Sequence, residues 1–263
     1  LKSDGASLYS TTDLATLVMR MKENNPDRVI YLADARQSMH FIQVFRCARK
    51  TGIVPDTTEL VHIGFGTMNG KDGKPFKTRD GGVMRLEYLL KEIDDEMLNK
   101  IKENQKEKEN LNIDEAEAEQ TAKTVALAAV KYGDLSNQAS KDYIFDIDRF
   151  TSFEGNTGPY ILYTIVRIKS ILSKYEAKGG DISALKDAIM PAVNAGQKNL
   201  MLSLAKFNAT IESAYEESAP HKICAYIYEL ANAFNGFYHD TKILSEENEE
   251  LKKSYISLLV LTK

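Results

Sequence analysis

The sequence predicts a mixed architecture, in which a parallel α/β sheet near the N-terminal end is followed by an all-α helical bundle. Two short apolar runs rich in β-forming residues, at 29–33 and 60–65, flank an amphipathic helical stretch. A strand, a helix and a second strand in this order are typical of parallel pairing through a crossover. After Gly82 the apolar residues recur almost only at helical spacing, which indicates helices packed on one another.

Helical periodicity also places a helix on either side of the first apolar run. Before that run, four apolar residues follow helical spacing behind a potential cap at Thr11 and Thr12: Leu14, Leu17, Val18 and Met21. After it, two rows share one broad face: Met39, Ile42 and Phe45, and Phe41, Val44 and Ala48. Gly52 followed by Pro55 is a stop signal for this second helix.

Three apolar rows mark the helices of the second half, and each is expected to face a shared core. They comprise Ile161, Ile165, Ile168 and Leu172; Leu200, Leu204, Phe207 and Ile211; and Ile223, Ile227, Leu230, Phe234 and Phe237. Glycines at 179–180 and an Ala-Pro pair at 219–220 mark connections between helices. Pro159 suits the start of the first helix, since the N–H that proline lacks has no partner there.

The composition is that of an ordinary globular protein, with 43% hydrophobic and 27% charged residues among 263. No stretch approaches the roughly 20 apolar residues that a membrane-spanning helix needs, so no membrane partner is expected. Cys47 and Cys224 form no paired motif, which argues against a disulfide framework or a metal site and favours a reducing, cytoplasmic location. The net charge of −4 does not exclude RNA, because phosphate binding needs only a local basic patch.

A glycine-rich loop at 66–82 carries the densest chemical signal and is expected to contain no regular element. Its cations are Lys71, Lys74, Lys77 and Arg79, and Thr78 supplies a hydroxyl among them. Glycines let a backbone approach a ligand and present N–H groups, while cations and a hydroxyl suit a polyphosphate. The spacing fits neither a Walker loop nor a dinucleotide-binding fingerprint. On these residues alone, a solvent-exposed turn with surface lysines is the favoured interpretation.

The string at 64–82, GFGTMNGKDGKPFKTRDGG, resembles the ATP-binding loop of arginyl-tRNA synthetases. In that family the loop takes the place of the usual lysine-serine signature of class I synthetases. The resemblance implies that Lys77, Thr78 and Arg79 stabilise charge as pyrophosphate leaves. It also implies that ATP, together with Mg²⁺, is bound as a substrate by Gly64, Lys74 and Lys77.

Upstream of the loop, the resemblance extends to the residues that bind the amino acid in this family. A tyrosine, an aspartate four residues later and a downstream glutamine hold L-arginine there, and they correspond to Tyr9, Asp13 and Gln37. An aspartate suits a guanidinium because two parallel hydrogen bonds can form. Without the resemblance, Asp13 is better explained as a charge near a helix N-terminus. His62 is interpreted as an ordinary half-buried strand histidine without a catalytic role.

Residues 145–170 resemble the entry to the family's anticodon-binding domain, which implies contact with tRNA. Tyr160, Tyr163 and Arg167 are spaced to share one helical face, and two rings beside a guanidinium suit base stacking and a phosphate contact. Periodicity alone favours both tyrosines as bundle core. Burial of all three side chains would favour a helical interaction domain without RNA. Residues 220–238 resemble a later helix of the family, whose aromatics we assign mostly to packing.

The resemblance covers nearly the whole chain and divides it into two parts. Residues 1–145 correspond to the C-terminal part of the class I catalytic domain, with part of its Rossmann-like sheet, and residues 146–263 to an anticodon-binding bundle that is incomplete at its C-terminus. Complete members of the family activate L-arginine with ATP and transfer it to tRNA(Arg), usually as monomers. Class I synthetases bind ATP through a His-Ile-Gly-His or His-Val-Gly-His motif. Neither motif occurs in this sequence. We therefore expect a portion of a longer ligase that is inactive alone; the alternative is a non-catalytic RNA-binding module.

Overall fold

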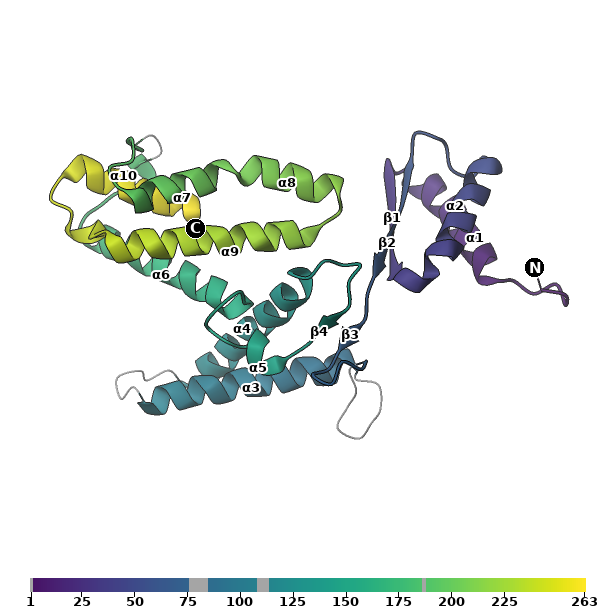
Figure 1. The fold of residues 1–263 in the computed structure, drawn as a ribbon, viewed down its shortest axis with the longest axis horizontal. Coiled ribbons are helices and arrows are strands. Elements are labelled where there is room, and N and C mark those ends of the chain that lie inside the picture. The colour runs from purple at the N-terminus through teal and green to yellow at the C-terminus, as the bar shows by residue number, and fades with distance from the viewer. Residues whose placement is uncertain (1, 76–84, 108–113, 186–187) are drawn as a thin grey trace. The chain divides into compact units, whose positions relative to one another are not determined.

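The chain forms two compact units in a computed structural model, and Figure 1 shows its helices and strands. The structure describes residues 2–75, 85–107, 114–185 and 188–263. One unit comprises Leu1–Asn69 and Ala139–Tyr143, and the other comprises Gly70–Gln138 and Ile144–Lys263. Within the described part of the chain, no helix has the length and apolar character needed to span a membrane.

The first unit is built on two parallel strands. β1 (Arg28–Asp34) and β2 (Glu59–Phe65) pair in a register that sets Arg28 opposite Glu59. The crossover between them runs through the 3-10 turn η1 (Ala35–Gln37) and the helix α2 (Ser38–Lys50), and α1 (Tyr9–Glu23) precedes β1. A small core joins these elements through Leu17, Val29, Val44, Ala48 and Val54. The predicted α/β arrangement is therefore confirmed.

The connection from α2 to β2 shows why the crossover ends where it does. Gly52 has a φ of +70°, a left-handed conformation that glycine adopts without strain, and the helix stops here as predicted. The Arg49 guanidinium donates hydrogen bonds to the carbonyl oxygens of Pro55 and Thr58. The Thr58 hydroxyl donates to the carbonyl oxygen of Pro26 (2.9 Å). These contacts hold the start of β2 beside the residues that lead into β1.

The second unit is helical, which confirms the predicted all-α part. Its helices are α3 (Leu86–Glu107), α4 (Glu115–Leu135), α5 (Ile147–Phe150), α6 (Gly158–Ala177), α7 (Ala195–Ala205), α8 (Phe207–Glu216), α9 (Pro220–Asp240) and α10 (Glu249–Thr262). The 3-10 turns η2 (Ser183–Leu185) and η3 (Ile243–Ser245) lie among them. The main core draws on α6, α7, α9 and α10, and its fully buried members include Leu200, Phe234, Phe237 and Ile256.

One predicted apolar row is divided by a helix boundary at Lys206 and does not face a single core. The Lys206 N–H donates to the carbonyl oxygen three residues back (3.2 Å), so α7 ends there and α8 begins. Phe207 and Ile211, beyond the turn, are exposed, whereas Leu200 before it is fully buried. The prediction is therefore wrong for the second half of this row. It is also wrong for Ile223, which is exposed in the first turn of α9.

A second, very short sheet interrupts the loop that was expected to be irregular. β3 (Met68–Asn69) pairs with β4 (Tyr143–Ile144), and the Tyr143 N–H donates to the Thr67 carbonyl oxygen (3.1 Å). The prediction of no regular element at 66–82 is therefore wrong at Met68 and Asn69. The prediction failed because the partner strand lies far along the chain, and a local pattern cannot indicate such a partner.

Candidate functional site

The start of the glycine-rich loop is held on the segment that follows α4. The Gly66 N–H donates to the Ala139 carbonyl oxygen (2.8 Å), and the Thr67 N–H donates to Asp142 Oδ1 (2.6 Å). A Cβ atom added to Gly66 would lie 2.4 Å from the carbonyl carbon of Lys141, so a side chain there requires a backbone shift. Glycine is therefore needed at this position for the close approach of two backbone segments within the protein.

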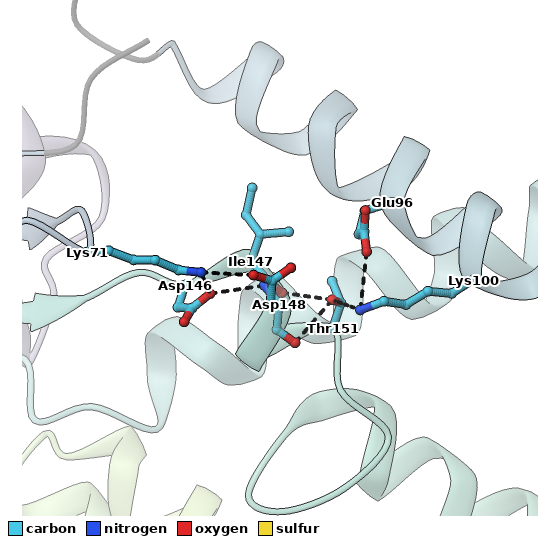
Figure 2. A network of polar contacts seen from close by, with 7 residues as sticks. All are labelled: Lys71, Glu96, Lys100, Asp146, Ile147, Asp148 and Thr151. Atoms are coloured by element: carbon cyan, nitrogen blue, oxygen red, sulfur yellow. Dashed lines mark hydrogen bonds and ion pairs between the residues drawn. The ribbon is translucent and has the colours of Figure 1, made fainter. Parts of the chain in front are cut away.

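Lys71, one of the loop cations, is paired with two carboxylates of the helical unit (Figure 2). Its Nζ lies 2.8 Å from Asp148 Oδ2 and 3.0 Å from Asp146 Oδ1. The hydrogen bond to Asp148, and then that to Asp146, raises the pKa of Lys71, and Lys71 in turn lowers the pKa of Asp148. Lys71 thus anchors the chain to residues 146–148 instead of standing free for a polyphosphate.

The same short segment is tied to α3 by further polar contacts. Lys100 Nζ of α3 donates to Thr151 Oγ1 (2.6 Å) and lies 3.3 Å from Glu96 Oε1 (Figure 2). Thr151 is fully buried, and its hydroxyl donates to the Ile147 carbonyl oxygen (2.7 Å) at the end of α5. The polar network from Lys71 to Lys100 therefore holds Lys71, α5 and α3 together.

The residues predicted to bind ATP are described only in part. Outside the described residues lie Lys77, Thr78 and Arg79. Lys74 is exposed in a turn closed by a hydrogen bond from the Gly70 N–H to the Lys74 carbonyl oxygen (2.8 Å). Gly64 is the penultimate residue of β2. A Cβ added there would lie 2.9 Å from Ala35 Cα, which is too close, so glycine allows the strand to pass near η1. Ligands of parallel α/β sheets bind at this carboxyl end of the strands.

The residues predicted to bind arginine lie around the N-terminal ends of α1 and α2. Asp13 Oδ2 lies 2.6 Å from His40 Nε2 of α2. Gln37 is exposed directly before α2, and Tyr9, the first residue of α1, is 87% exposed. Asp13 lies beyond the first turn of α1, so its interpretation as an N-terminal helix charge is not supported. The sequence assigned no role to His40, because its pairing with Asp13 joins two different helices.

Asp34, at the carboxyl end of β1, has a pKa that is lowered by its contacts with Arg36. Hydrogen bonds from the Arg36 side chain (Nε–Oδ1 2.9 Å), and then from its backbone N–H, lower the pKa of Asp34 to about 2. Because folding lowers this pKa, the pair stabilises the unit above about pH 4 and loses that contribution as the pH falls through about 2.

We expect Arg36→Gln to raise the pKa of Asp34 but leave it below the ordinary 3.8, since the backbone N–H still donates. An NMR titration of the Asp34 side-chain carboxyl measures both values. An unchanged pKa in the variant would show that the Arg36 side chain is not the cause.

Tyr160, Tyr163 and Arg167 meet on one face of α6. The Arg167 guanidinium lies over the rings of Tyr163 (4.8 Å) and Tyr238 (5.0 Å), and its Nη2 donates to the Tyr163 hydroxyl (3.1 Å). Tyr163 is 48% exposed, and Tyr160 and Arg167 are half-buried. The interpretation of both tyrosines as bundle core is therefore wrong for Tyr163. Burial of all three would have favoured the interaction domain without RNA, and these exposures do not give it that support.

The helix α9 supplies side chains to this face that the sequence-based prediction missed. The Tyr160 hydroxyl donates to Asn232 Oδ1 (2.7 Å), and Asn235 Nδ2 donates to the Tyr160 hydroxyl (2.9 Å). Tyr238, one of the aromatics of residues 220–238 that we assigned mostly to packing, is 42% exposed and lies against Arg167. Asn232 and Asn235, three residues apart in a mostly apolar helix, are the sequence signal that could have indicated a polar face.

The chain matches two known families of protein domains. Residues 1–147, more than half of the chain, match the family described as "tRNA synthetases class I (R), catalytic domain". The chain belongs to the arginyl-tRNA synthetase family of class I. Residues 161–263 match the DALR anticodon binding domain. Both matches confirm the family resemblance and the predicted fold class, whereas the division between 1–145 and 146–263 stays a prediction.

Curated relatives and solved structures agree with this assignment to the arginyl-tRNA synthetases. The chain is 56% identical over 262 residues to the arginine–tRNA ligase of Alkaliphilus oremlandii (strain OhILAs), and 45% identical over 264 residues to that of Francisella tularensis subsp. tularensis (strain WY96-3418). Each alignment covers 100% of this chain, which spans 43% of the length of either relative.

Two solved structures extend the comparison to the fold. The arginyl-tRNA synthetase of Plasmodium falciparum matches with a TM-score of 0.80 at 28% identity, over 99% of this chain and 42% of that one. The Thermus thermophilus arginyl-tRNA synthetase matches with a TM-score of 0.79 at 22% identity, over 100% of this chain and 47% of that one. The second match shows the shared fold alone.

Proposed function

We propose that this chain supplies part of the catalytic domain and the anticodon-binding helices of an arginine–tRNA ligase. In this reaction the carboxylate of L-arginine attacks the α-phosphorus of ATP and pyrophosphate leaves. A terminal ribose hydroxyl of tRNA(Arg) then attacks the arginyl carbonyl carbon and AMP leaves. The match of residues 1–147 to the catalytic domain of the family carries the proposal. Because the chain spans 43% of its relatives' length, the activity is proposed for a protein of that length, as a cytoplasmic monomer.

For the ATP half of the reaction, the proposal assigns charge stabilisation to Lys77, Thr78 and Arg79. Two cations and a hydroxyl offset the negative charge that develops on the leaving pyrophosphate. Gly64 and Lys74 are proposed as further ATP contacts, which the place of Gly64 at the carboxyl end of β2 supports. Mg²⁺ is usually held through substrate phosphates, so we propose that it enters with ATP.

For arginine, the proposal assigns the substrate guanidinium to the Asp13 carboxylate, with hydrogen bonds from Tyr9 and Gln37. The contact with His40 uses Asp13 Oδ2 and leaves Oδ1 for the substrate. A carboxylate with one oxygen already held presents the other in a defined direction. The exposure of Tyr9 and Gln37 supports their access to a ligand.

For tRNA, the proposal assigns contacts with unpaired bases to the face of α6 that carries Tyr160, Tyr163 and Arg167. Exposed tyrosine rings beside a guanidinium are the side chains on which unpaired RNA bases stack. The match of residues 161–263 to an anticodon-binding domain supports this assignment.

Arginine recognition is tested in a protein of the relatives' length that carries this sequence. We expect Asp13→Asn to raise the KM for arginine about thirtyfold and to leave the KM for ATP within about twofold, because a charged hydrogen-bond partner worth about 2 kcal/mol is lost. Pyrophosphate exchange in the presence of tRNA(Arg) measures both constants. Asp56→Asn, at an exposed aspartate between α2 and β2, is the matched control. Equal rises in both KM values, or exchange independent of arginine, would contradict the proposal.

A non-catalytic tRNA-binding module is the second candidate function. It is favoured by the match of residues 161–263 to an anticodon-binding domain, a match that concerns tRNA binding alone. Filter binding of labelled tRNA(Arg) to the chain, together with the exchange assay above, separates the two candidates. Salt-dependent tRNA binding without arginine-dependent exchange, even in a protein of the relatives' length, would support the module.

A further inference from the structure

Asn235 lies at the centre of the polar contacts between α6 and α9, two helices that pack on each other (Figure 1). Its Oδ1 accepts a hydrogen bond from Arg167 Nη1 (2.5 Å). Its Nδ2 donates to the hydroxyls of Tyr160 (2.9 Å) and Thr164 (3.3 Å). Both ends of the amide are used, so its orientation follows from its partners: the oxygen faces the guanidinium and the nitrogen faces the hydroxyls.

The Arg167 guanidinium held by Asn235 also lies between two aromatic rings. Its central carbon is 4.8 Å from the ring centroid of Tyr163 and 5.0 Å from that of Tyr238, within the range of cation–π attraction. Its two terminal nitrogens donate to Asn235 and to the Tyr163 hydroxyl. The guanidinium is thus engaged within the protein through both terminal nitrogens and both neighbouring rings, unlike a side chain extended toward a phosphate.

The two rings keep surface for a ligand, since Tyr163 is 48% and Tyr238 42% exposed. Unpaired RNA bases stack on such rings with little dependence on sequence. We propose that Asn235 is a positioning residue of the RNA face: it fixes Arg167 between Tyr163 and Tyr238, so that the two rings form a rigid platform for unpaired bases. This inference rests on the proposed tRNA binding and makes Arg167 a spacer between rings rather than a phosphate contact.

The platform is tested with a fluorescein-labelled hairpin RNA that contains the anticodon stem and loop of tRNA(Arg). Its binding to the chain is measured by fluorescence anisotropy at several KCl concentrations. We expect Asn235→Leu to raise the Kd about tenfold, the equivalent of about one weakened base stack. Arg167→Lys retains the charge but loses the planar group, and we expect a similar rise. The slope of log Kd against log KCl concentration is expected to stay that of the wild type in both variants.

A double variant distinguishes positioning from general structural damage. If Asn235 acts through Arg167, the variant that combines Asn235→Leu with Arg167→Lys binds no more weakly than either single variant. Additive losses would overturn the proposal. A second pair tests the ring: Tyr238→Phe is expected to bind as the wild type does, and Tyr238→Leu about tenfold more weakly.

The matched control is Asn199→Leu, the same change at an exposed asparagine of α7, which is expected to leave the Kd unchanged. Wild-type affinity in Asn235→Leu or in Arg167→Lys, or a salt slope reduced by about one as for a lost phosphate contact, would overturn the inference. If the wild type binds the hairpin no better than a blunt duplex of its stem, the proposed RNA binding fails, and the inference with it. If the wild type prefers the hairpin and Asn235→Leu binds it with the same Kd, the proposed RNA binding stands and only the positioning role of Asn235 is overturned.

Discussion

Replacing Phe237 with alanine is expected to lower the free energy of unfolding of the helical unit by about 3–5 kcal/mol. Phe237 is fully buried in α9, and its ring meets that of Tyr255 in α10 edge-on, with 5.3 Å between the centroids. It belongs to the same core as Leu200 and Phe234. Alanine removes the ring and leaves a cavity that these neighbours fill only in part, so lost burial and lost packing both contribute. Urea denaturation followed by far-UV circular dichroism measures the change.

Phe207→Ala is the matched control, because it removes the same ring from the surface of α8. Phe207 is 51% exposed, so we expect a loss below about 1 kcal/mol. The two variants therefore separate the effect of burial from that of deleting a phenylalanine. Equal losses would show that Phe237 does not stand at the core of the unit.

Gly158→Ala is expected to destabilise the same unit by about 3 kcal/mol, at the upper end of ordinary overpacking. Gly158 is the first residue of α6, and a Cβ there would lie 2.2 Å from the Ala128 carbonyl oxygen and 2.5 Å from its carbonyl carbon in α4. Backbone atoms of a helix cannot turn aside as the end of a side chain can, so α4 and α6 must separate. The residues that α4 buries are mostly small, which permits such close packing: Ala118, Ala122, Ala126, Ala129 and Gly133.

Gly236→Ala is the control with the opposite expected sign. Gly236 is exposed within α9, and an added Cβ would have no atom within 4 Å. Alanine there is expected to stabilise the helix by about 0.5–1 kcal/mol, because glycine loses more conformational freedom on folding. Thermal unfolding of the two variants gives the comparison. A neutral effect of Gly158→Ala, or destabilisation by Gly236→Ala of the same size, would contradict the close approach of α6 to α4.

Local patterns located the secondary-structure elements where short-range rules decide them. Gly52 ends α2 with a positive φ, and Pro159 lies in the first turn of α6, both as predicted. Apolar runs and apolar spacing indicate the type of an element whatever its partner is. Both β-rich runs therefore form strands, and the helical rows lie in helices. Burial follows the rows less closely, since Met39 and Ile42 are exposed. The pattern failed beyond Lys206, where α7 ends and α8 begins and where Phe207 and Ile211 are exposed.

The sequence predicted which residues form the candidate site, but not which residues of other helices they contact. The meeting of Tyr160, Tyr163 and Arg167 follows from their spacing on one helix, and the contact of Arg167 with Tyr163 agrees with it. Asn235 joins this group from another helix, and its role could not be read from spacing alone. The assignments for ATP, arginine and tRNA came from strings that resemble a family, and they stay proposals for each residue.

By itself, the sequence determined which segments become helices or strands, which face of most of them is apolar, and to which family the chain belongs. These properties depend on neighbouring residues or on strings that can be compared directly. Only the tertiary structure decided that Lys71 pairs with Asp146 and Asp148, and that Arg167 lies between Tyr163 and Tyr238. Most of these contacts join residues far apart in the chain, and their geometry arises from how whole elements pack, which no local pattern encodes.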